Sequence, residues 1–305
     1  MSEEADAILC CASCGVAGGD DVKLKRCNGC YLVRYCGIEC QRRHRREHKK
    51  ECKKRAAELR DELLFKQPES SYLGDCPICC LPLLPMAMDG KLSLQRCCSK
   101  RICNGCFYAH TMHEIEEKLE NKCPFCRYPM LFSDEEGERI LMKRVEANDP
   151  VALCDMGEDR AHEGDFESAF ECFTKAVAFG NNTQAHFQLS RLYHEGQGVE
   201  KDTKKELYHL EEAAIGGHAD GRHNLGCVEN DRGRLDRAVK HWVIAANMGN
   251  DDSLEALKKL YRKGLVSKDD LASALRAHHA AVEATKSPQR EEARMSFRNM
   301  KMKMK

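Results

Sequence analysis

The sequence lacks long apolar runs and has no net charge. No stretch approaches the ~18 to 20 consecutive apolar residues that a membrane-spanning helix needs. The first nine residues, MSEEADAIL, are acidic and too short for the three parts of a secretory signal. Lys plus Arg and Asp plus Glu both number 49, so there is no global attraction to nucleic acid or to anionic membranes. We therefore expect a cytoplasmic or nuclear protein without a signal peptide, a transmembrane segment or a membrane partner.

Cysteine is almost absent from the second half of the chain and abundant in the first. Of the 20 cysteines, 17 precede residue 127, and only Cys154, Cys172 and Cys227 follow it. In a reducing compartment, closely spaced cysteine pairs favour metal thiolates over disulfides. The two halves are therefore expected to be stabilised by different chemistry, and the three late cysteines are expected to be small core residues.

The first cysteine-rich segment contains four pairs of residues at chelating distance along the chain. The eight residues are Cys11, Cys14, Cys27, Cys30, Cys36, Cys40, His48 and Cys52. Eight ligands suit two tetrahedral zinc sites. The segment has too few large apolar residues for a core of its own. Structural zinc supplies on the order of 10 to 16 kcal/mol in zinc-finger peptides, and we expect it to fold this module.

The run YCGIECQ, followed by HKKEC and preceded by two CxxC pairs, resembles the MYND zinc finger. The resemblance implies interleaved sites, one formed by Cys11, Cys14, Cys36 and Cys40, and the other by Cys27, Cys30, His48 and Cys52. It also implies binding of short proline-containing peptides. Arg45 stands where the family usually has tryptophan, which leaves that activity open. Cys10 has no place in the pattern and is either a spare thiol or an alternative to Cys11.

A second module begins with CPIC at residues 76 to 79 and ends with CPFCR at residues 123 to 127, and these motifs resemble a RING finger. The resemblance assigns one zinc to Cys76, Cys79, Cys103 and Cys106. The other site would use Cys98, Cys123 and Cys126, with Cys97 as the favoured fourth ligand. His110, His113 and an empty site are the alternatives, because Lys100 occupies the position of the usual family histidine.

The RING resemblance also implies a docking surface for a ubiquitin-conjugating enzyme. Such modules form no bonds themselves and act by proximity and orientation, so no catalytic residue is expected. Ile78 and Pro124 would form an apolar groove, and Arg127 would donate hydrogen bonds to the bound enzyme and ubiquitin. Each residue also has a purely structural interpretation: Ile78 as core, Pro124 as part of the knuckle turn, and Arg127 as a solvated charge.

Residues 149 to 285 contain a repeat with helical periodicity. Aligned segments start at Ala152, Ala185, Gly221 and Ser253, at offsets of 33, 36 and 32 residues, and each is followed by a second amphipathic stretch. The phrase HEGQGVEKDTKKELYHLEEAAIGGHADGRHNLG resembles Sel-like repeats, relatives of tetratricopeptide repeats. The resemblance implies about four helical pairs in a short solenoid with a concave protein-binding face.

The predicted fold is multidomain, with two small cross-braced zinc-binding α+β modules followed by an all-α helical-repeat solenoid. The expected boundaries are a disordered amino terminus (1–9), the MYND-like finger (10–54), a charged helical linker (55–71), the RING-like finger (72–132), a linker (133–148), the repeats (149–285) and a basic Met-rich tail, expected to be disordered (286–305). Residues 41 to 55 carry nine Lys or Arg against two Glu and predict a helix with a solvated basic face.

These features favour a zinc-binding interaction scaffold with four zinc ions per chain, two in each module. The favoured activity is that of a RING-type ubiquitin ligase, in which the MYND finger and the repeats bind a substrate protein. The alternative is a non-catalytic adaptor whose RING-like module is a structural interaction domain. Lys100 weakens the ligase interpretation, whereas Ile78, Pro124 and Arg127 support it. Nucleic acid is not expected as a partner, because neither module has the spacing of a DNA-reading finger.

Overall fold

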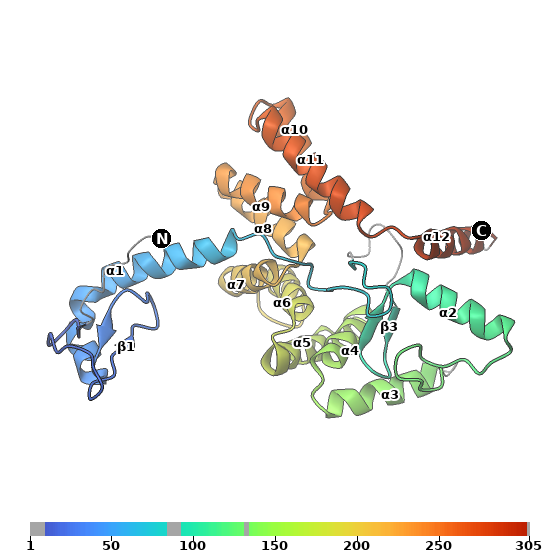
Figure 1. The fold of residues 1–305 in the computed structure, drawn as a ribbon, viewed down its shortest axis with the longest axis horizontal. Coiled ribbons are helices and arrows are strands. Elements are labelled where there is room, and N and C mark those ends of the chain that lie inside the picture. The colour runs from blue at the N-terminus through green and yellow to red at the C-terminus, as the bar shows by residue number, and fades with distance from the viewer. Residues whose placement is uncertain (1–9, 84–92, 131–133, 304–305) are drawn as a thin grey trace. The chain divides into compact units, whose positions relative to one another are not determined.

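The computed structural model describes residues 10–83, 93–130 and 134–303. The chain divides into two compact units, residues 1–66 and 67–305, each considered separately below (Figure 1). The segment 1–9, expected to be disordered, lies outside the described residues. In the described part of the chain, no helix is both long enough and apolar enough to cross a membrane.

The first unit contains one small hairpin and one long helix. Strands β1 (Lys25–Arg26) and β2 (Arg34–Tyr35) pair antiparallel, and helix α1 (Ile38–Leu64) follows. Helix α1 starts inside the cysteine-rich segment and continues through most of the predicted linker. The eight Lys and Arg side chains between residues 42 and 54 are all exposed, in agreement with the solvated basic face expected for this stretch.

The second unit opens with the second cysteine-rich module. Strands β3 (Ser93–Gln95) and β4 (Lys100–Ile102) pair antiparallel and lead directly into helix α2 (Asn104–Glu116). Helix α3 (Asp134–Glu146) then occupies the segment predicted to be a linker. It packs on the first repeat helix, where its Leu141 is buried with Ala152 and Met156.

Four antiparallel helix pairs form the solenoid, in agreement with the four predicted repeats (Figure 1). The pairs are α4 (Pro150–His162) with α5 (Phe166–Gly180), α6 (Thr183–Glu195) with α7 (Thr203–Ile215), α8 (Ala219–Asp231) with α9 (Leu235–Asn247), and α10 (Asp251–Arg262) with α11 (Lys268–Glu283). The all-α helical-repeat architecture expected from the sequence is confirmed.

Helix capping explains the repeat spacing. The first helix of every pair has an N-cap side chain that accepts a hydrogen bond from the backbone N–H three residues later, which satisfies an otherwise unpaired donor. The four caps are Asp149, Asn182, His218 and Asn250, and their donors are Ala152, Ala185, Gly221 and Ser253. These donors are the residues at which the sequence repeats align, so the repeat marks where each first helix begins.

The helices of a pair approach closely where a glycine faces an aromatic ring. A Cβ on Gly157 of α4 would lie 2.6 Å from the ring of Phe173 on α5, and one on Gly226 of α8 would lie 2.6 Å from Trp242 on α9. Both rings belong to the buried apolar clusters of the solenoid. The solenoid is therefore held together by interdigitated apolar packing of Leu, Phe, Trp and Ala side chains.

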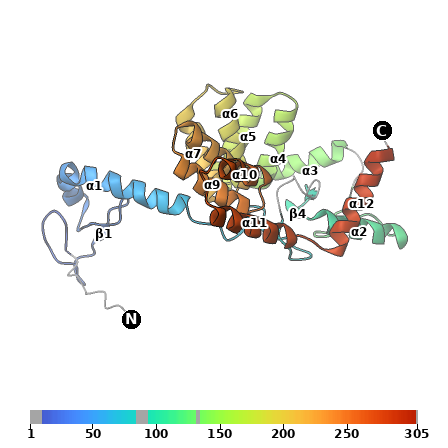
Figure 2. The same ribbon diagram turned by 90° about the horizontal axis from the view of Figure 1, so that it is seen from above.

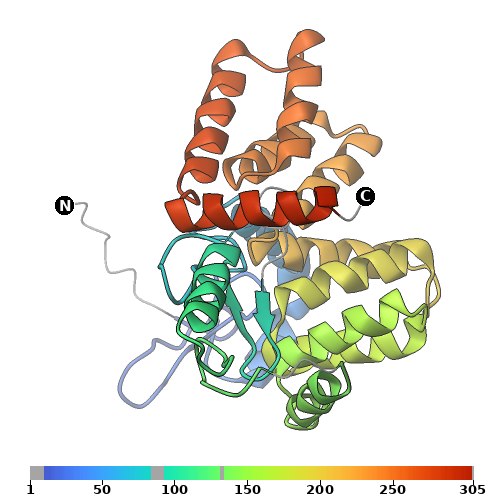
Figure 3. The same cartoon turned by 90° about the vertical axis from the view of Figure 1, so that its right-hand side faces the viewer.

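The carboxyl-terminal segment differs from expectation. Residues 288 to 303 form helix α12 (Pro288–Lys303), so the prediction of a disordered tail is wrong for this stretch. Helix α12 lies across α2 of the second cysteine-rich module (Figures 2 and 3). The polar sequence of α12 does not predict an ordered helix. Ala293 and Arg290 are both buried in the contact with α2, so tertiary packing stabilises the helix despite its composition.

Candidate metal centres

The structure gathers sixteen side chains into four groups of four possible zinc ligands. Within each group, all ligand atoms lie within 4.8 Å of one another. The groups are Cys11, Cys14, Cys36 and Cys40; Cys27, Cys30, His48 and Cys52; Cys76, Cys79, Cys103 and Cys106; and Cys97, Cys98, Cys123 and Cys126. In both modules the pairs interleave along the chain, which is the cross-braced arrangement.

A shared backbone turn brings the paired cysteines together. In four of the Cys-x2-Cys pairs, the residue that follows has a positive φ: Gly15, Tyr31, Cys80 and Arg127, at 73°, 59°, 55° and 61°. The N–H of that residue donates to the carbonyl oxygen of the first cysteine over 2.8 to 3.0 Å in every case. A left-handed non-glycine residue costs roughly 1–2 kcal/mol, so the three non-glycine turns indicate that metal binding stabilises this geometry.

The distances between ligand atoms fit tetrahedral zinc. Zn–S bonds of ~2.3 Å place neighbouring sulfurs of a tetrahedron about 3.8 Å apart. The observed Sγ–Sγ separations are 3.6 Å for Cys14 and Cys36, 3.8 Å for Cys79 and Cys103, and 4.0 Å for Cys98 and Cys123. All these cysteines are free thiols rather than disulfides. The donor sets therefore suit zinc, and the protein is a zinc-binding protein.

Electrostatics explains why the groups need a cation. Backbone N–H groups of Cys36 and Cys14 lower the pKa of Cys11 to about 6. Burial opposes ionisation of Cys76, yet N–H groups of Cys103 and Cys79 bring its pKa to about 7. For Cys98, burial and the neighbouring thiolates raise the pKa to about 11. One thiolate forms readily, but further thiolates at this distance repel one another unless a divalent ion lies between them.

In the first module, two aromatic residues support the zinc-ligand candidate His48. The ring of His44 stacks on His48 with centroids 5.6 Å apart and planes 10° apart, and its Nδ1 is 3.1 Å from the hydroxyl of Tyr35. Packing against neighbouring side chains in this way holds a metal-binding ring in one orientation. Sequence reasoning missed His44, although it lies one helical turn before His48, a spacing that places both on one face.

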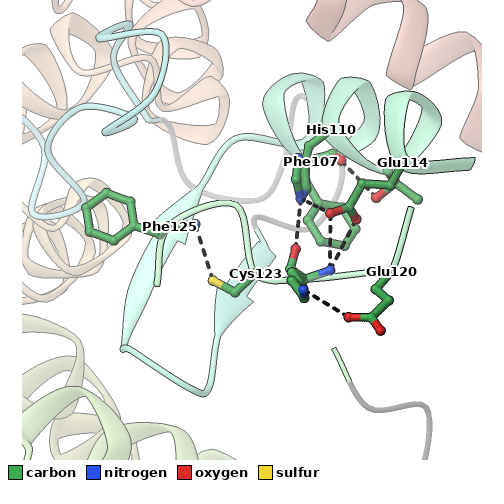
Figure 4. A network of polar contacts seen from close by, with 8 residues as sticks. Phe107, His110, Glu114, Glu120, Cys123 and Phe125 are labelled. Atoms are coloured by element: carbon green, nitrogen blue, oxygen red, sulfur yellow. Dashed lines mark hydrogen bonds and ion pairs between the residues drawn. The ribbon is translucent and has the colours of Figure 1, made fainter. Parts of the chain in front are cut away.

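In the second module, the structure brings Cys97 rather than a histidine to the fourth position. The Sγ atoms of Cys97 and Cys126 are 3.4 Å apart. His110 instead donates from Nε2 to the carbonyl oxygen of Lys122 over 2.8 Å, next to the buried Glu114, which accepts from the N–H of Lys122 (Figure 4). This network ties α2 to the segment before Cys123. Cys10 and Cys80 are exposed and belong to none of the four groups.

The three predicted docking residues lie on the zinc knuckles of the second module. Ile78 is 45% exposed, Pro124 is half-buried and Arg127 is exposed. Phe125, which sequence reasoning did not select, is 44% exposed beside Pro124. The ammonium of Lys100 lies 5.5 Å from the centroid of the Phe125 ring, a cation–π contact. The side chain of Lys100 therefore packs on Phe125, next to the second group of candidate ligands, and is not itself one of that group.

Two polar side chains, each next to a candidate ligand, fix the second metal group of this module to the solenoid. Arg96, directly before Cys97, pairs with Asp155 and Asp159 of α4 over 2.9 and 2.7 Å. Ser99, directly after Cys98, donates to the N-cap residue Asp149 over 3.0 Å. The side chains of Arg96 and Asp159 are 36% and 40% exposed, so these ion pairs position the segment more than they stabilise the fold. The segment that carries Cys97 and Cys98 is therefore held by the first repeat.

An aromatic contact joins the start of this module to the middle of the solenoid. The ring of Tyr72 stacks on His218 with centroids 4.6 Å apart, and Phe187 covers the same imidazole at 4.2 Å. The Tyr72 hydroxyl donates to Gln184 Oε1 over 2.8 Å, and His218 Nε2 donates to the same oxygen. Burial lowers the pKa of His218 to about 3, so the imidazole is neutral at pH 7.

Comparison with known proteins identifies the first module. Residues 11–52 match the family model of the MYND finger, and this range contains all eight ligand candidates of the first unit. The MYND resemblance inferred from the sequence is confirmed. The matched segment is a small part of the chain, so it assigns a module rather than the whole protein. In the second module, the structure shows two groups of four cysteines.

Two solved structures are similar to this chain. A Sel1 repeat protein from Oxalobacter formigenes has 25% sequence identity and a TM-score of 0.44, over 58% of this chain and 71% of that one. The protective antigen c5321 of uropathogenic Escherichia coli strains, which displays an SLR fold, has 20% identity and a TM-score of 0.40, over 63% of this chain and 39% of that one. No curated protein matches the sequence.

Proposed function

We propose that the protein is a zinc-stabilised interaction scaffold with two zinc ions in each cysteine-rich module. The sixteen grouped side chains would be the ligands. The finger and the repeats would bind partner proteins, because MYND and Sel-like modules are protein-binding modules. The four groups have protein ligands at every tetrahedral position, which is typical of structural rather than catalytic zinc.

We further propose that the second module is a RING-type ubiquitin ligase module. The observation that supports this most strongly is the exposure of Ile78, an apolar side chain between the two candidate ligands of the first Cys-x2-Cys turn of this module. The exposed Phe125 and Arg127 on the last knuckle extend the case. A ubiquitin-conjugating enzyme would dock on these knuckles, and the finger or the solenoid would hold the substrate protein.

An autoubiquitination assay with a panel of conjugating enzymes tests this proposal. We expect Ile78→Ala to reduce the formation of ubiquitin chains about tenfold, because a tenfold change corresponds to the loss of one contact worth ~1.4 kcal/mol. Arg127→Asn should reduce it as well, and asparagine tolerates the positive φ at that position. Ile115→Ala is the matched control, because Ile115 is an exposed isoleucine of the same module on α2.

The second candidate is a non-catalytic adaptor, and the anchoring of the module favours it. Arg96, Ser99 and Tyr72 fasten the module to the solenoid, and α12 packs on its helix α2. A module held on several sides can serve as a rigid spacer. If no enzyme of the panel produces ubiquitin chains above background while the protein retains all its zinc, the ligase proposal is overturned. The adaptor function then remains.

A further inference from the structure

Arg290 of α12 is buried against the first metal group of the second module. Its side chain is only 7% exposed. Nη1 donates to the carbonyl oxygens of Pro82 and Thr285 over 2.8 and 2.9 Å, and Nη2 donates to the carbonyl oxygen of Leu81 over 3.1 Å. Nη2 also lies 3.5 Å from Sγ of Cys79. The guanidinium thus lies against the knuckle that carries two candidate ligands.

The positive charge of Arg290 is buried among backbone carbonyl oxygens and the thiol of Cys79. Among the residues described by the structure, no Asp or Glu side chain forms an ion pair with it, and its Nε has no hydrogen-bond partner. A buried cation is costly unless an opposite charge compensates it. Four thiolates around one Zn²⁺ carry a net charge of −2. The candidate tetrathiolate centre of Cys76, Cys79, Cys103 and Cys106 is therefore the counter-charge that the structure offers.

The approach of α12 to this centre depends on a glycine placed between two ligand candidates. A Cβ on Gly105, which lies between Cys103 and Cys106, would be 2.6 Å from the backbone nitrogen of Arg290 and 2.8 Å from its Cα. One turn further along α12, Ala293 is fully buried, and Phe297 meets Tyr108 of α2 edge to face. Helix α2, which carries the candidate ligand Cys106, therefore allows the backbone of α12 to approach closely at Arg290 because Gly105 has no side chain.

We propose that Arg290 is a positioning residue of the first zinc centre of the second module. It compensates the negative charge of the tetrathiolate and donates a hydrogen bond to Cys79, which makes the carboxyl-terminal helix part of the zinc site. Hydrogen bonds to a metal-bound thiolate lower its reactivity and hold it in place. Arg290 therefore protects this centre from attack by electrophiles and chelators, and α12 stays docked through the same contacts.

Alkylation of the zinc-loaded full-length chain by N-ethylmaleimide, mapped cysteine by cysteine with mass spectrometry, tests the proposal. In Arg290→Met we expect the four cysteines of this centre to react about tenfold faster than in the wild type, which is the lower end of the effect on metal affinity when a residue that supports a metal ligand is replaced. Arg290→Lys keeps the charge and should react at an intermediate rate. The cysteines of the MYND finger serve as an internal control in the same sample and should not change.

Arg294→Gln is the matched control, because Arg294 is an exposed arginine on the same helix. Equal rates at Cys79 in Arg290→Met and Arg294→Gln would overturn the proposal, and so would equal rates in Arg290→Met and Arg290→Lys. A uniform rise at all sixteen ligands would also contradict it, because the effect must be local. Should Arg290→Met fail to fold, Gly105→Ala provides a second test. It displaces α12 while keeping the arginine, and the same rise at Cys79 is expected.

Discussion

The zinc modules and the solenoid differ in what their cores are made of. In the first module the buried cluster consists of Tyr35 and four ligand cysteines, and in the second it contains Cys76 and Cys103 with two aliphatic residues. The two large clusters of the solenoid consist almost wholly of Leu, Val, Phe, Trp and Ala. One chain therefore draws its folding free energy from metal–thiolate bonds at one end and from apolar burial at the other.

The two zinc modules also differ from each other. They share the knuckle turn and the interleaved pairing, but only the second belongs to the same compact unit as the repeats. The polar contacts of Arg96 and Ser99 and the packing of α12 make the second module continuous with the helical part of the chain. Metal loss in that module should therefore disturb more of the protein than metal loss in the first.

The largest expected effect comes from removing one ligand. Cys97→Ser should reduce the zinc content of the purified chain by one ion, because serine is a poor ligand for structural zinc and the other three cysteines cannot fill the tetrahedron. Native mass spectrometry measures the number of bound ions directly. Cys80→Ser is the control, since Cys80 is an exposed thiol outside the four groups. An unchanged zinc count in Cys97→Ser would exclude Cys97 as the fourth ligand.

A core substitution in the solenoid should reduce stability without reducing the zinc content. Leu257 is fully buried in the cluster around Trp242. Leu257→Ala should lower the free energy of unfolding of the helical repeats by about 2–5 kcal/mol, the usual cost of a large-to-small change in a core. Urea denaturation followed by Trp242 fluorescence measures the loss. The zinc content should remain that of the wild type. A loss of zinc in this variant would contradict the claim that the zinc modules and the repeats are stabilised separately.

A smaller effect should appear in the pH dependence of stability. The pKa of His218 is about 3 in the folded protein because the ring is buried against Tyr72 and Phe187, whereas an exposed histidine has a pKa near 6.5. The unfolded chain therefore binds an extra proton between these values, so stability falls as the pH drops below about 6.5. His218→Gln should reduce this slope in denaturation curves measured from pH 7.5 to pH 5.

His194→Gln is the control for the pH experiment, because His194 lies at the surface beside Glu206. It should leave the slope at its wild-type value. The slope should not vanish in His218→Gln, since burial also lowers the pKa of His209, to about 4. A wild-type slope in His218→Gln would show that the contact between Tyr72 and the solenoid is not the source of the acid sensitivity.

Local spacing in the sequence predicted the ligand pairs and the helix pairs, because both depend on residues close together in the chain. The assembly of distant ligand pairs into groups of four was expected only from the family resemblances. Cys11 and Cys14 are brought together by one turn, and the repeat spacing reflects N-caps such as Asn182. The contacts missing from the sequence analysis join distant segments. Arg290 meets Cys79 across most of the chain, and the charged sequence around it carries no apolar periodicity. Only the folded arrangement shows why α12 is ordered.

Hydrogen exchange measured before and after chelation tests the central claim most directly, namely that zinc folds the two modules and apolar packing folds the repeats. A strong zinc chelator is added to the full-length chain, and amide protection is followed by mass spectrometry. We predict that protection disappears across residues 11–52, 76–83 and 93–127 while helices α4 to α11 keep theirs. Protection that persists in both modules after complete zinc removal, or that is lost equally from the repeats, would contradict the account.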